Sequence, residues 1–256
     1  MTIDLARVLQ HESAVARWRG LEQWQRNIRK IDVASLSLLG GALSDSHAFV
    51  RWQAGQILAA HAEGRVKLLE LLDQQSAHEV WVVALDALQR VPISNFEAVL
   101  QRMLQYDDVA LRRSAAEALR YHATSKSTGM LLAALQDEDL WVRRAAAYAL
   151  AYLDEPDVVS ALIMQLTDSS VLVQQGVVYA LGALRAKAAA STFMQLLSHP
   201  DDIVRRNAAW ALGRIEAADA LPDLARLRND DANSIVAQVA QQAIKTIRRP
   251  KWLPFL

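Results

Sequence analysis

The sequence predicts an all-α protein, a right-handed α-solenoid (an α–α superhelix) made of about seven to eight helix-pair repeats. The first observation is a phrase that opens on an apolar residue and runs through alanine-rich sequence to a second apolar residue. The second is its regular recurrence, with starts 30 to 32 residues apart at Val50, Val80, Leu111, Val142, Val173, Val204 and Val236. So many copies in one register exclude a chance match and are typical of a repeat array.

Composition supports a helical fold and narrows the class of protein. The 256 residues are 52% hydrophobic and include only 9 glycines and 6 prolines, the residues that interrupt helices most strongly. No apolar run reaches the roughly 18 residues of a membrane-spanning helix, and the N-terminal residues do not resemble a secretory signal. The chain has no cysteine, which excludes disulfides and thiolate metal sites and fits the cytoplasm, where we expect the protein to reside.

Each repeat is expected to contain a first helix (A), a short turn and a second helix (B). In the repeat around Val142, the apolar residues of helix B fall on one stripe at helical spacing: Val142, Ala146, Ala149, Leu150 and Leu153. A second stripe, about 20 residues earlier, predicts helix A. Five of the turns carry a side chain suited to capping the N-terminus of helix B: Asp108, Asp139, Ser170, Asp201 and Asn233.

A single helix pair cannot bury its own apolar stripe, so neighbouring repeats must stack into one continuous core. We therefore expect one repeat domain over residues 1–256. Its expected parts are an N-terminal capping repeat at 1–34, seven repeats at 35–248 and a C-terminal tail at 249–256. Arg17 and Trp18 echo Arg51 and Trp52, which suggests that the cap is a divergent eighth repeat. A basic N-terminal cluster and the apolar tail leave open that an end of the chain docks a partner.

The repeated phrase resembles that of HEAT repeats, most clearly in the segments 137–150 and 204–215. More narrowly, it is similar to the short bacterial HEAT-like repeat that also occurs in phycobilin lyases, and the resemblance covers roughly residues 35–248. It implies a ladder between repeats, formed by an Asp in each turn and an Arg early in each helix B. The matching aspartates are Asp45, Asp137, Asp168 and Asp231, and the matching arginines are Arg51, Arg112, Arg143 and Arg205.

The implied ladder is only partial, because several repeats depart from the pattern. The Asp position holds other residues at Gln75, Tyr106 and His199, and the Arg position does so at Trp81, Gln174 and Ala237. We therefore expect the stiffness of the stack to vary along the chain.

A strip of arginines beside large aromatic residues is the candidate binding site. It follows the faces of the B helices, which usually line the concave side of an α-solenoid. This arginine–aromatic strip consists of Arg113, Arg144, Tyr148, Tyr152, Tyr179, Arg206, Trp210 and Arg214. Arginine binds carboxylates through a planar fork of donors, and tyrosine and tryptophan are enriched at binding hot spots. The competing interpretation is that Arg113 pairs with Glu117 and that the aromatics only fill gaps between alanine-rich helices.

No catalytic motif or metal-binding pattern is present. The six histidines do not pair at helical spacing, and His11-Glu12 and His78-Glu79 do not fit the His-Glu pairs of the HEAT-repeat hydroxylase that modifies deoxyhypusine. The chain also has no phosphate-binding loop and no nucleophile elbow. We expect neither a metal nor a cofactor, and no enzymatic activity.

The predicted function is therefore that of a non-catalytic protein–protein interaction scaffold that holds an acidic or mixed peptide of a partner protein in its concave groove. One alternative is a phycobilin-lyase-like enzyme, in which the strip's aromatics would stack on a flat bilin-like ligand and its arginines would bind the ligand's carboxylates. A weaker one is DNA binding, as in the HEAT-like alkylpurine DNA glycosylases. The 28 basic side chains are balanced by 28 acidic ones, which disfavours nucleic acid, and no membrane association is expected.

Overall fold

The computed structural model describes residues 4–28, 30–74, 77–94 and 96–249. Over these residues it contains sixteen α-helices, four short 3-10 turns and no strand. The prediction of an all-α fold is confirmed. Within this part of the chain, no helix has the length and apolar character needed to cross a membrane.

The chain divides into two compact units, Met1–His122 and Ala123–Leu256, and each contains four successive helix pairs. The helices of the first unit are α1 (Leu5–Leu9), α2 (Ala14–Asn27), α3 (Val33–Ala42), α4 (Ala48–Ala60), α5 (Ala62–Asp73), α6 (His78–Leu88), α7 (Phe96–Met103) and α8 (Val109–His122). Those of the second are α9 (Thr128–Ala134), α10 (Leu140–Leu150), α11 (Pro156–Met164), α12 (Val171–Ala183), α13 (Ala190–Leu196), α14 (Asp202–Arg214), α15 (Leu221–Asp230) and α16 (Ser234–Arg248).

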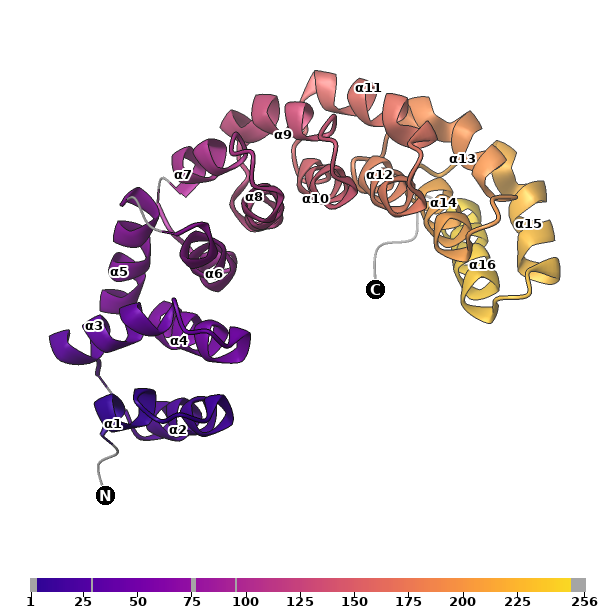
Figure 1. Ribbon diagram of the computed structural model, residues 1–256. Coiled ribbons are helices and arrows are strands. Elements are labelled where there is room, and N and C mark those ends of the chain that lie inside the picture. Colours follow the sequence, from indigo (N-terminus) through magenta and orange to yellow (C-terminus); the bar gives the residue numbers. More distant parts are fainter. Residues whose placement is uncertain (1–3, 29, 75–76, 95, 250–256) are drawn as a thin grey trace. The chain divides into compact units, whose positions relative to one another are not determined.

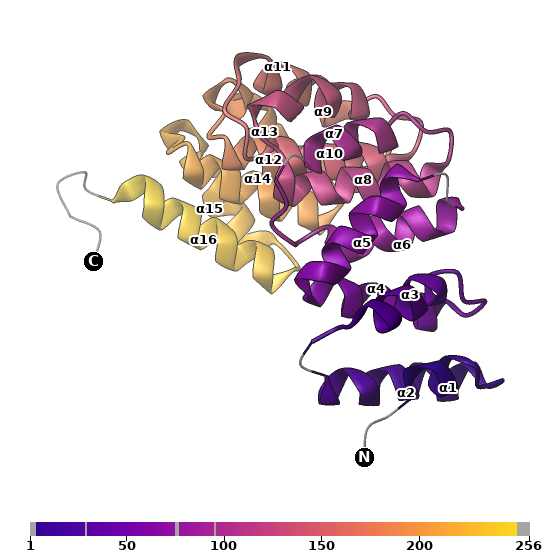
Figure 2. The same cartoon turned by 90° about the vertical axis from the view of Figure 1, so that its left-hand side faces the viewer.

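Each unit has two layers, with the A helices (odd numbers) in one and the B helices (even numbers) in the other (Figures 1 and 2). In the first unit α2, α4 and α6 each pack against the next B helix, and α10, α12 and α14 do so in the second. The first apolar residue of every repeated phrase is buried, as Val142 and Val204 illustrate. The predicted stripe is therefore the face that holds each helix pair together.

The N-terminal segment forms a helix pair like the others. Helix α2 buries Leu21 and Trp24 and packs against α4, and α1 packs against both α2 and α3. The segment in which Arg17 and Trp18 echo a later repeat thus forms the helix pair α1–α2. The predicted C-terminal tail lies, apart from Arg249, outside the described residues.

Side-chain caps start most of the predicted B helices. Asp139 accepts hydrogen bonds from the backbone nitrogens of Trp141 (3.1 Å) and Val142 (3.2 Å) at the start of α10. Asp108, Asp201 and Asn233 cap α8, α14 and α16 in the same way. Ser170 occupies the N-cap position of α12, but its side chain makes no capping hydrogen bond.

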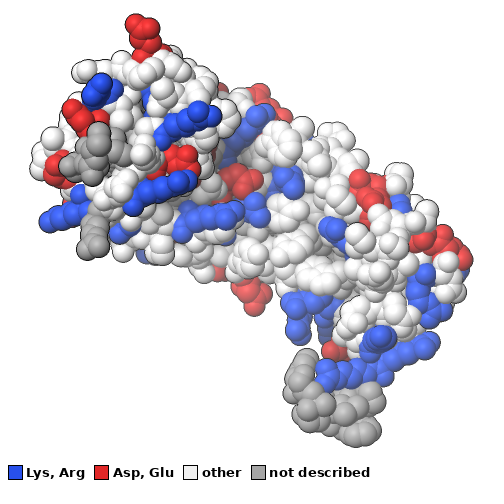
Figure 3. Space-filling model, turned by 90° about the horizontal axis from the view of Figure 1, so that it is seen from below, with Lys and Arg blue, Asp and Glu red and all other residues white. Residues whose placement is uncertain are grey.

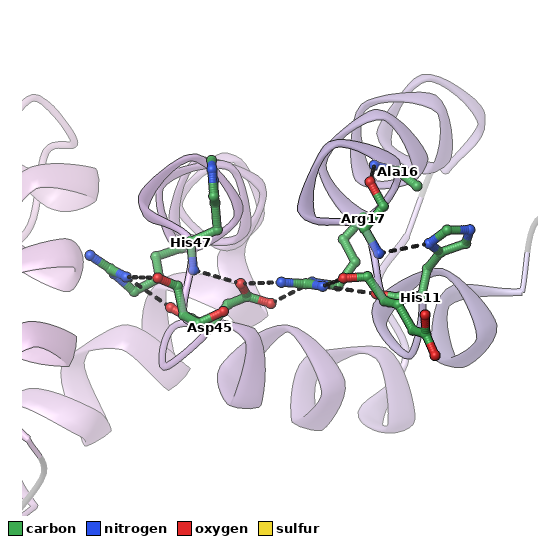
Figure 4. A network of polar contacts seen from close by, with 9 residues as sticks. His11, Ala16, Arg17, Asp45 and His47 are labelled. Carbon is green, nitrogen blue, oxygen red and sulfur yellow. Dashed lines mark hydrogen bonds and ion pairs between the residues drawn. The ribbon is translucent and has the colours of Figure 1, made fainter.

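The ladder between repeats is present as three bidentate ion pairs within the units. Figure 4 shows the first, in which Arg17 of α2 donates both Nε and Nη2 to the carboxylate of Asp45 at 2.8 Å. The other two join Arg143 to Asp168 and Arg205 to Asp231, with Nε donating at 2.8 and 2.7 Å. These six side chains are between 3% and 17% exposed. Each pair thus links one helix B to the turn that precedes the next helix B.

Each ladder arginine also ties down its own turn. Arg143 Nη1 donates to the carbonyls of Asp137 (2.8 Å) and Glu138 (2.9 Å). Arg51 and Arg112, at the same position in other repeats, bind the equivalent carbonyls. The arginine therefore stabilises the turn locally, whatever occupies the next repeat.

An aromatic cluster takes the place of one ion pair in the first unit. Trp81 occupies the Arg position and Tyr106 the partner Asp position, and their rings meet edge to face with centroids 5.2 Å apart. His78 stacks on Trp81 at 5.3 Å, and Trp81 Nε1 donates to the carbonyl of Leu71 at 2.8 Å. Two departures that look independent in the sequence thus form one contact.

The second replacement is polar. Gln174 and His199 occupy the Arg and Asp positions of partner repeats, so both ends of this rung change together. Gln174 Nε2 donates to the carbonyl of Asp168 at 2.7 Å, as a ladder arginine would. Its Oε1 is buried and has no hydrogen-bond partner among the residues that the structure describes. His199 Nδ1 accepts from the backbone nitrogen of Asp201 at 3.0 Å, as a ladder aspartate would. A third departure, at Gln75, lies outside the described residues.

Candidate functional site

Most of the arginine–aromatic strip lies in the second unit. Seven of its residues belong to α10, α12 and α14 or to the turn after α10: Arg144, Tyr148, Tyr152, Tyr179, Arg206, Trp210 and Arg214. Tyr152 comes just after the end of α10 and is 67% exposed. The remaining member, Arg113, is an exposed residue of α8 in the first unit. The site described below is the second-unit part of the strip.

Three aromatic rings from three successive B helices form a continuous stack. The ring centroids of Tyr148 and Tyr179 are 5.3 Å apart at an interplanar angle of 47°. Those of Tyr179 and Trp210 are 5.4 Å apart and nearly parallel, at 6°. Both distances lie in the range of favourable aromatic pairs. The one-repeat spacing seen in the sequence therefore places equivalent side chains in direct contact.

Glycines provide the space for this aromatic stack. A Cβ atom added to Gly182 of α12 would lie 2.6 Å from Cζ3 of Trp210, and one added to Gly176 would lie 3.3 Å from Cε2 of Tyr148. The rings thus fill gaps between the B helices, as the packing interpretation of the sequence proposed. Each ring is nevertheless only partly buried, so part of its surface faces solvent.

The arginines lie over the rings at both ends of the stack. The Cζ atom of Arg144 is 5.2 Å from the ring centroid of Tyr148 and 5.5 Å from that of Trp141. The Cζ atom of Arg214 is 5.6 Å from the ring centroid of Trp210. These distances are typical of cation–π contacts, which orient a guanidinium group without neutralising its charge.

These guanidinium groups have no carboxylate partner among the described residues. Arg144 Nε is shielded from solvent and makes no hydrogen bond. Arg214 Nη2 donates to the carbonyl of Ala183 at 3.2 Å, and Arg206 Nη2 lies 3.5 Å from Asn207 Oδ1, at the limit of a hydrogen bond. The ladder arginines Arg17, Arg143 and Arg205, by contrast, each hold an aspartate in bidentate geometry. Figure 3 shows one face of the molecule, on which Lys and Arg side chains (blue) and Asp and Glu side chains (red) are scattered among uncharged residues.

The position of α12 that is equivalent to Arg144 and Arg206 has a structural role. Gln175 is buried and its Nε2 donates to Asp201 Oδ1 at 3.1 Å, while its carbonyl accepts from Asn207 Nδ2 at 3.0 Å. Trp141, which the sequence prediction did not include, joins the site because Arg144 lies over its ring. Its position directly before the repeated phrase, where Phe49 stands in an earlier repeat, is the signal that could have found it.

Outside the strip, several polar side chains of the turns have structural roles. No group of three or more His, Asp or Glu residues in the described part of the chain is arranged to hold a metal ion. His199 and the paired aspartates of the turns are occupied as caps or as ladder positions. The arrangement can therefore offer guanidinium donors and aromatic faces to a ligand.

Comparison with known protein families agrees with this architecture. Residues 96–172 and 159–245 match the sequence profile of HEAT repeats. The chain belongs to the HEAT-repeat family. Within these repeats, the ladder joins the second helix of one repeat to the turn of the next, and most of the strip lies on the second helices. The search of curated proteins found no match to the sequence.

Several solved structures are similar to this HEAT-repeat chain. The crystal structure of YibA from Escherichia coli superimposes with a TM-score of 0.70, at 19% identity, over 94% of this chain and 91% of that one. An engineered protein gives 0.62 at 21% identity, over 96% and 78%. The CpcE–CpcF complex of phycocyanin lyase from Nostoc gives 0.53 at 18% identity, over 86% and 96%. At such identities the similarity concerns the fold.

Proposed function

We propose that this HEAT-repeat protein is a non-catalytic scaffold that binds an acidic segment of a partner polypeptide along α10, α12 and α14. Three guanidinium groups, those of Arg144, Arg206 and Arg214, have no carboxylate partner in the described part of the chain and lie beside a stack of aromatic rings. This observation carries the proposal. A carboxylate from a partner would complete the hydrogen bonding of these groups.

The physical chemistry of the strip favours a polypeptide ligand. Arginine, tyrosine and tryptophan are the residue types that dominate binding energy at protein interfaces. Tyr148 and Trp210 already pack closely against Gly176 and Gly182, and cation–π contacts already orient Arg144 and Arg214. Binding would therefore require little further ordering of these side chains.

The geometry of the aromatic stack disfavours the binding of a large flat ligand between its rings. Tyr179 and Trp210 lie nearly parallel with centroids 5.4 Å apart, which leaves no room for a third ring between them. A bilin that stacked between them would have to separate α12 from α14, whose close packing depends on Gly182. A flexible acidic peptide, in contrast, can follow the exposed edges of the rings and reach each guanidinium in turn.

Peptide selection tests the proposal and does not require the partner to be identified first. A random-peptide display library panned against the protein should enrich sequences rich in Asp and Glu, whose affinity is then measured by fluorescence anisotropy at several salt concentrations. The double variant Arg144→Ala/Arg206→Ala should weaken binding at least about tenfold, because two charge-assisted contacts are lost. Circular dichroism should confirm that helicity is unchanged.

The matched control is Arg226→Ala. Arg226 lies on α15, its side chain is 75% exposed, and it pairs with Asp223, so its loss removes one positive charge of the same unit without touching the strip. This variant should bind the selected peptides as the unmodified protein does. Enrichment of peptides that are not acidic, or equal binding to the double variant, would show that the strip is not the binding surface.

A further inference from the structure

The aromatic stack ends beside a groove, although the repeat continues. Equivalent positions of successive B helices hold Tyr148, Tyr179 and Trp210, and the next repeat places Gln242 of α16 there. A groove of about 210 Å³ lies between α14 and α16 at this point. Its walls include Trp210, Arg214, Val239 and Gln242.

We propose that this α14–α16 groove is a subsite for one aromatic side chain of the bound polypeptide, and that Arg214 binds an acidic residue next to it. This inference rests on the proposed function and adds a specificity to it. The partner segment would then combine an aromatic residue with neighbouring Asp or Glu residues.

The size of the groove selects the kind of group that fits. It is smaller than the roughly 300 to 1,000 Å³ of pockets that bury whole small-molecule ligands, so it suits one planar side chain. Val239, Ala243 and Gly213 contribute apolar wall, while Gln242 and Thr246 add polar groups at the α16 side. A planar ring in this groove would contact Trp210, which already stacks with Tyr179 of the preceding repeat.

A close approach of the two helices forms one wall of the groove. A Cβ atom added to Gly213 would lie 3.0 Å from both Cα and Cβ of Ala243, so α14 and α16 are in backbone contact there. Such a contact resists collapse of the neighbouring space, because closing the groove would require the two helices to move. The groove is therefore held open by the fold itself.

Charge complementarity identifies the neighbour of the aromatic residue. The Arg214 guanidinium lies over the ring of Trp210, at 5.6 Å, and donates a hydrogen bond to the carbonyl of Ala183. It is exposed and has no carboxylate partner among the described residues. Arg214 is itself part of the groove wall. A segment that places a ring in the groove would meet this positive charge beside it, so an acidic neighbouring residue is favoured.

The test compares two acidic peptides that differ at one position. Fluorescein-labelled glutamate peptides carry either one central Phe or one central Ala, and anisotropy measures the affinity of each. The full-length protein should bind the Phe peptide about tenfold more tightly, since a phenyl ring leaves water on binding. Gln242→Trp fills the groove with the type of side chain that the preceding repeats carry, and should abolish this preference while leaving affinity for the Ala peptide unchanged.

The matched control places the same side chain one helical turn away. Gln238 is an exposed residue of α16, and Gln238→Trp should retain the preference for Phe. A second outcome is that the unmodified protein binds both peptides equally and Arg144→Ala/Arg206→Ala binds neither. That result would overturn the subsite and leave the proposed function standing. A preference that persists in Gln242→Trp would also overturn the subsite. Failure of both peptides to bind would reject the subsite and the acidic-segment function together.

Discussion

Removing Arg205 should destabilise the last two repeats more than any surface change, because this side chain joins them. Its Nε and Nη2 donate to the carboxylate of Asp231 at 2.7 and 3.1 Å, and its Nη1 donates to the carbonyls of His199 and Pro200. The Arg205→Met variant keeps the apolar part of the side chain and loses all four hydrogen bonds. The Asp231 carboxylate, whose side chain is 3% exposed, would keep one backbone donor, the nitrogen of Asn233.

The expected loss is about 3 kcal/mol, the lower end of the cost of leaving one partner of a buried ion pair uncompensated. The lower end applies because the Arg205 side chain is itself 17% exposed, so that water can reach part of the vacated space. Neutralising the remaining charge should recover part of this loss. We expect the double variant Arg205→Met/Asp231→Asn to be more stable than Arg205→Met alone, with a coupling energy of about 1 to 3 kcal/mol.

Hydrogen exchange resolved by mass spectrometry is the suitable assay, because repeat arrays need not unfold in one step. The loss should concentrate in peptides from α14, α15 and α16. Arg226→Met, which breaks an exposed pair in the same unit, should change protection by less than about 0.5 kcal/mol. A loss below about 1 kcal/mol in Arg205→Met, or a loss spread evenly over the chain, would refute the reasoning that the ladder couples adjacent repeats.

The same ion pair makes stability depend on acid. Hydrogen bonds from Arg205 lower the pKa of the Asp231 carboxyl below its usual range and outweigh its desolvation. A carboxyl group whose pKa is depressed in the folded state contributes stability above its unfolded pKa of about 3.9, and this contribution disappears as the pH falls through the folded pKa. The stability difference between the unmodified protein and Arg205→Met should therefore shrink below about pH 4. A difference that stays constant there would contradict the assignment.

Three further predictions follow from the departures and the glycines. The double variant Gln174→Arg/His199→Asp should restore a missing ion pair of the ladder. It should stabilise the second unit by about 1 to 3 kcal/mol relative to the sum of the single variants, measured by a double-mutant cycle in urea. Additive effects of the two substitutions would disprove that positions 174 and 199 are partners. Gly182→Ala should cost about 1 to 3 kcal/mol in urea unfolding, because the added Cβ would lie 2.6 Å from Trp210. Gly41→Ala, in the open part of α3, should instead stabilise by about 0.4 to 1 kcal/mol, and a matching loss at both glycines would refute the steric argument.

Local sequence signals were sufficient for the repeats and their caps. The helical periodicity and the 30- to 32-residue spacing depend on residues close together in the chain, as does the cap that Asp139 places on α10. The Asp and Arg positions of the ladder could also be assigned, through the resemblance to HEAT-like repeats. Pairs such as Arg143–Asp168 have this predictability because each side chain is fixed by its own turn.

The composition of the site could be predicted only in part. The residues of the strip share one helix face, and periodicity shows that much. Whether a residue on that face is a free donor or an internal contact depends on the helices beside it. Gln175 turns inward to Asp201, while Arg144 lies against aromatic rings without a carboxylate partner.

The sequence by itself determined that this protein is a stack of helix pairs, because the apolar periodicity that forms each helix lies within a single repeat. The tertiary structure decided what lies between repeats. Trp81 and Tyr106 replace an ion pair together, and the stack that ends at Trp210 leaves a groove where Gln242 follows. The physical reason is that these features depend on contacts between residues one repeat apart, which are set by helix packing and by the small residues that permit it.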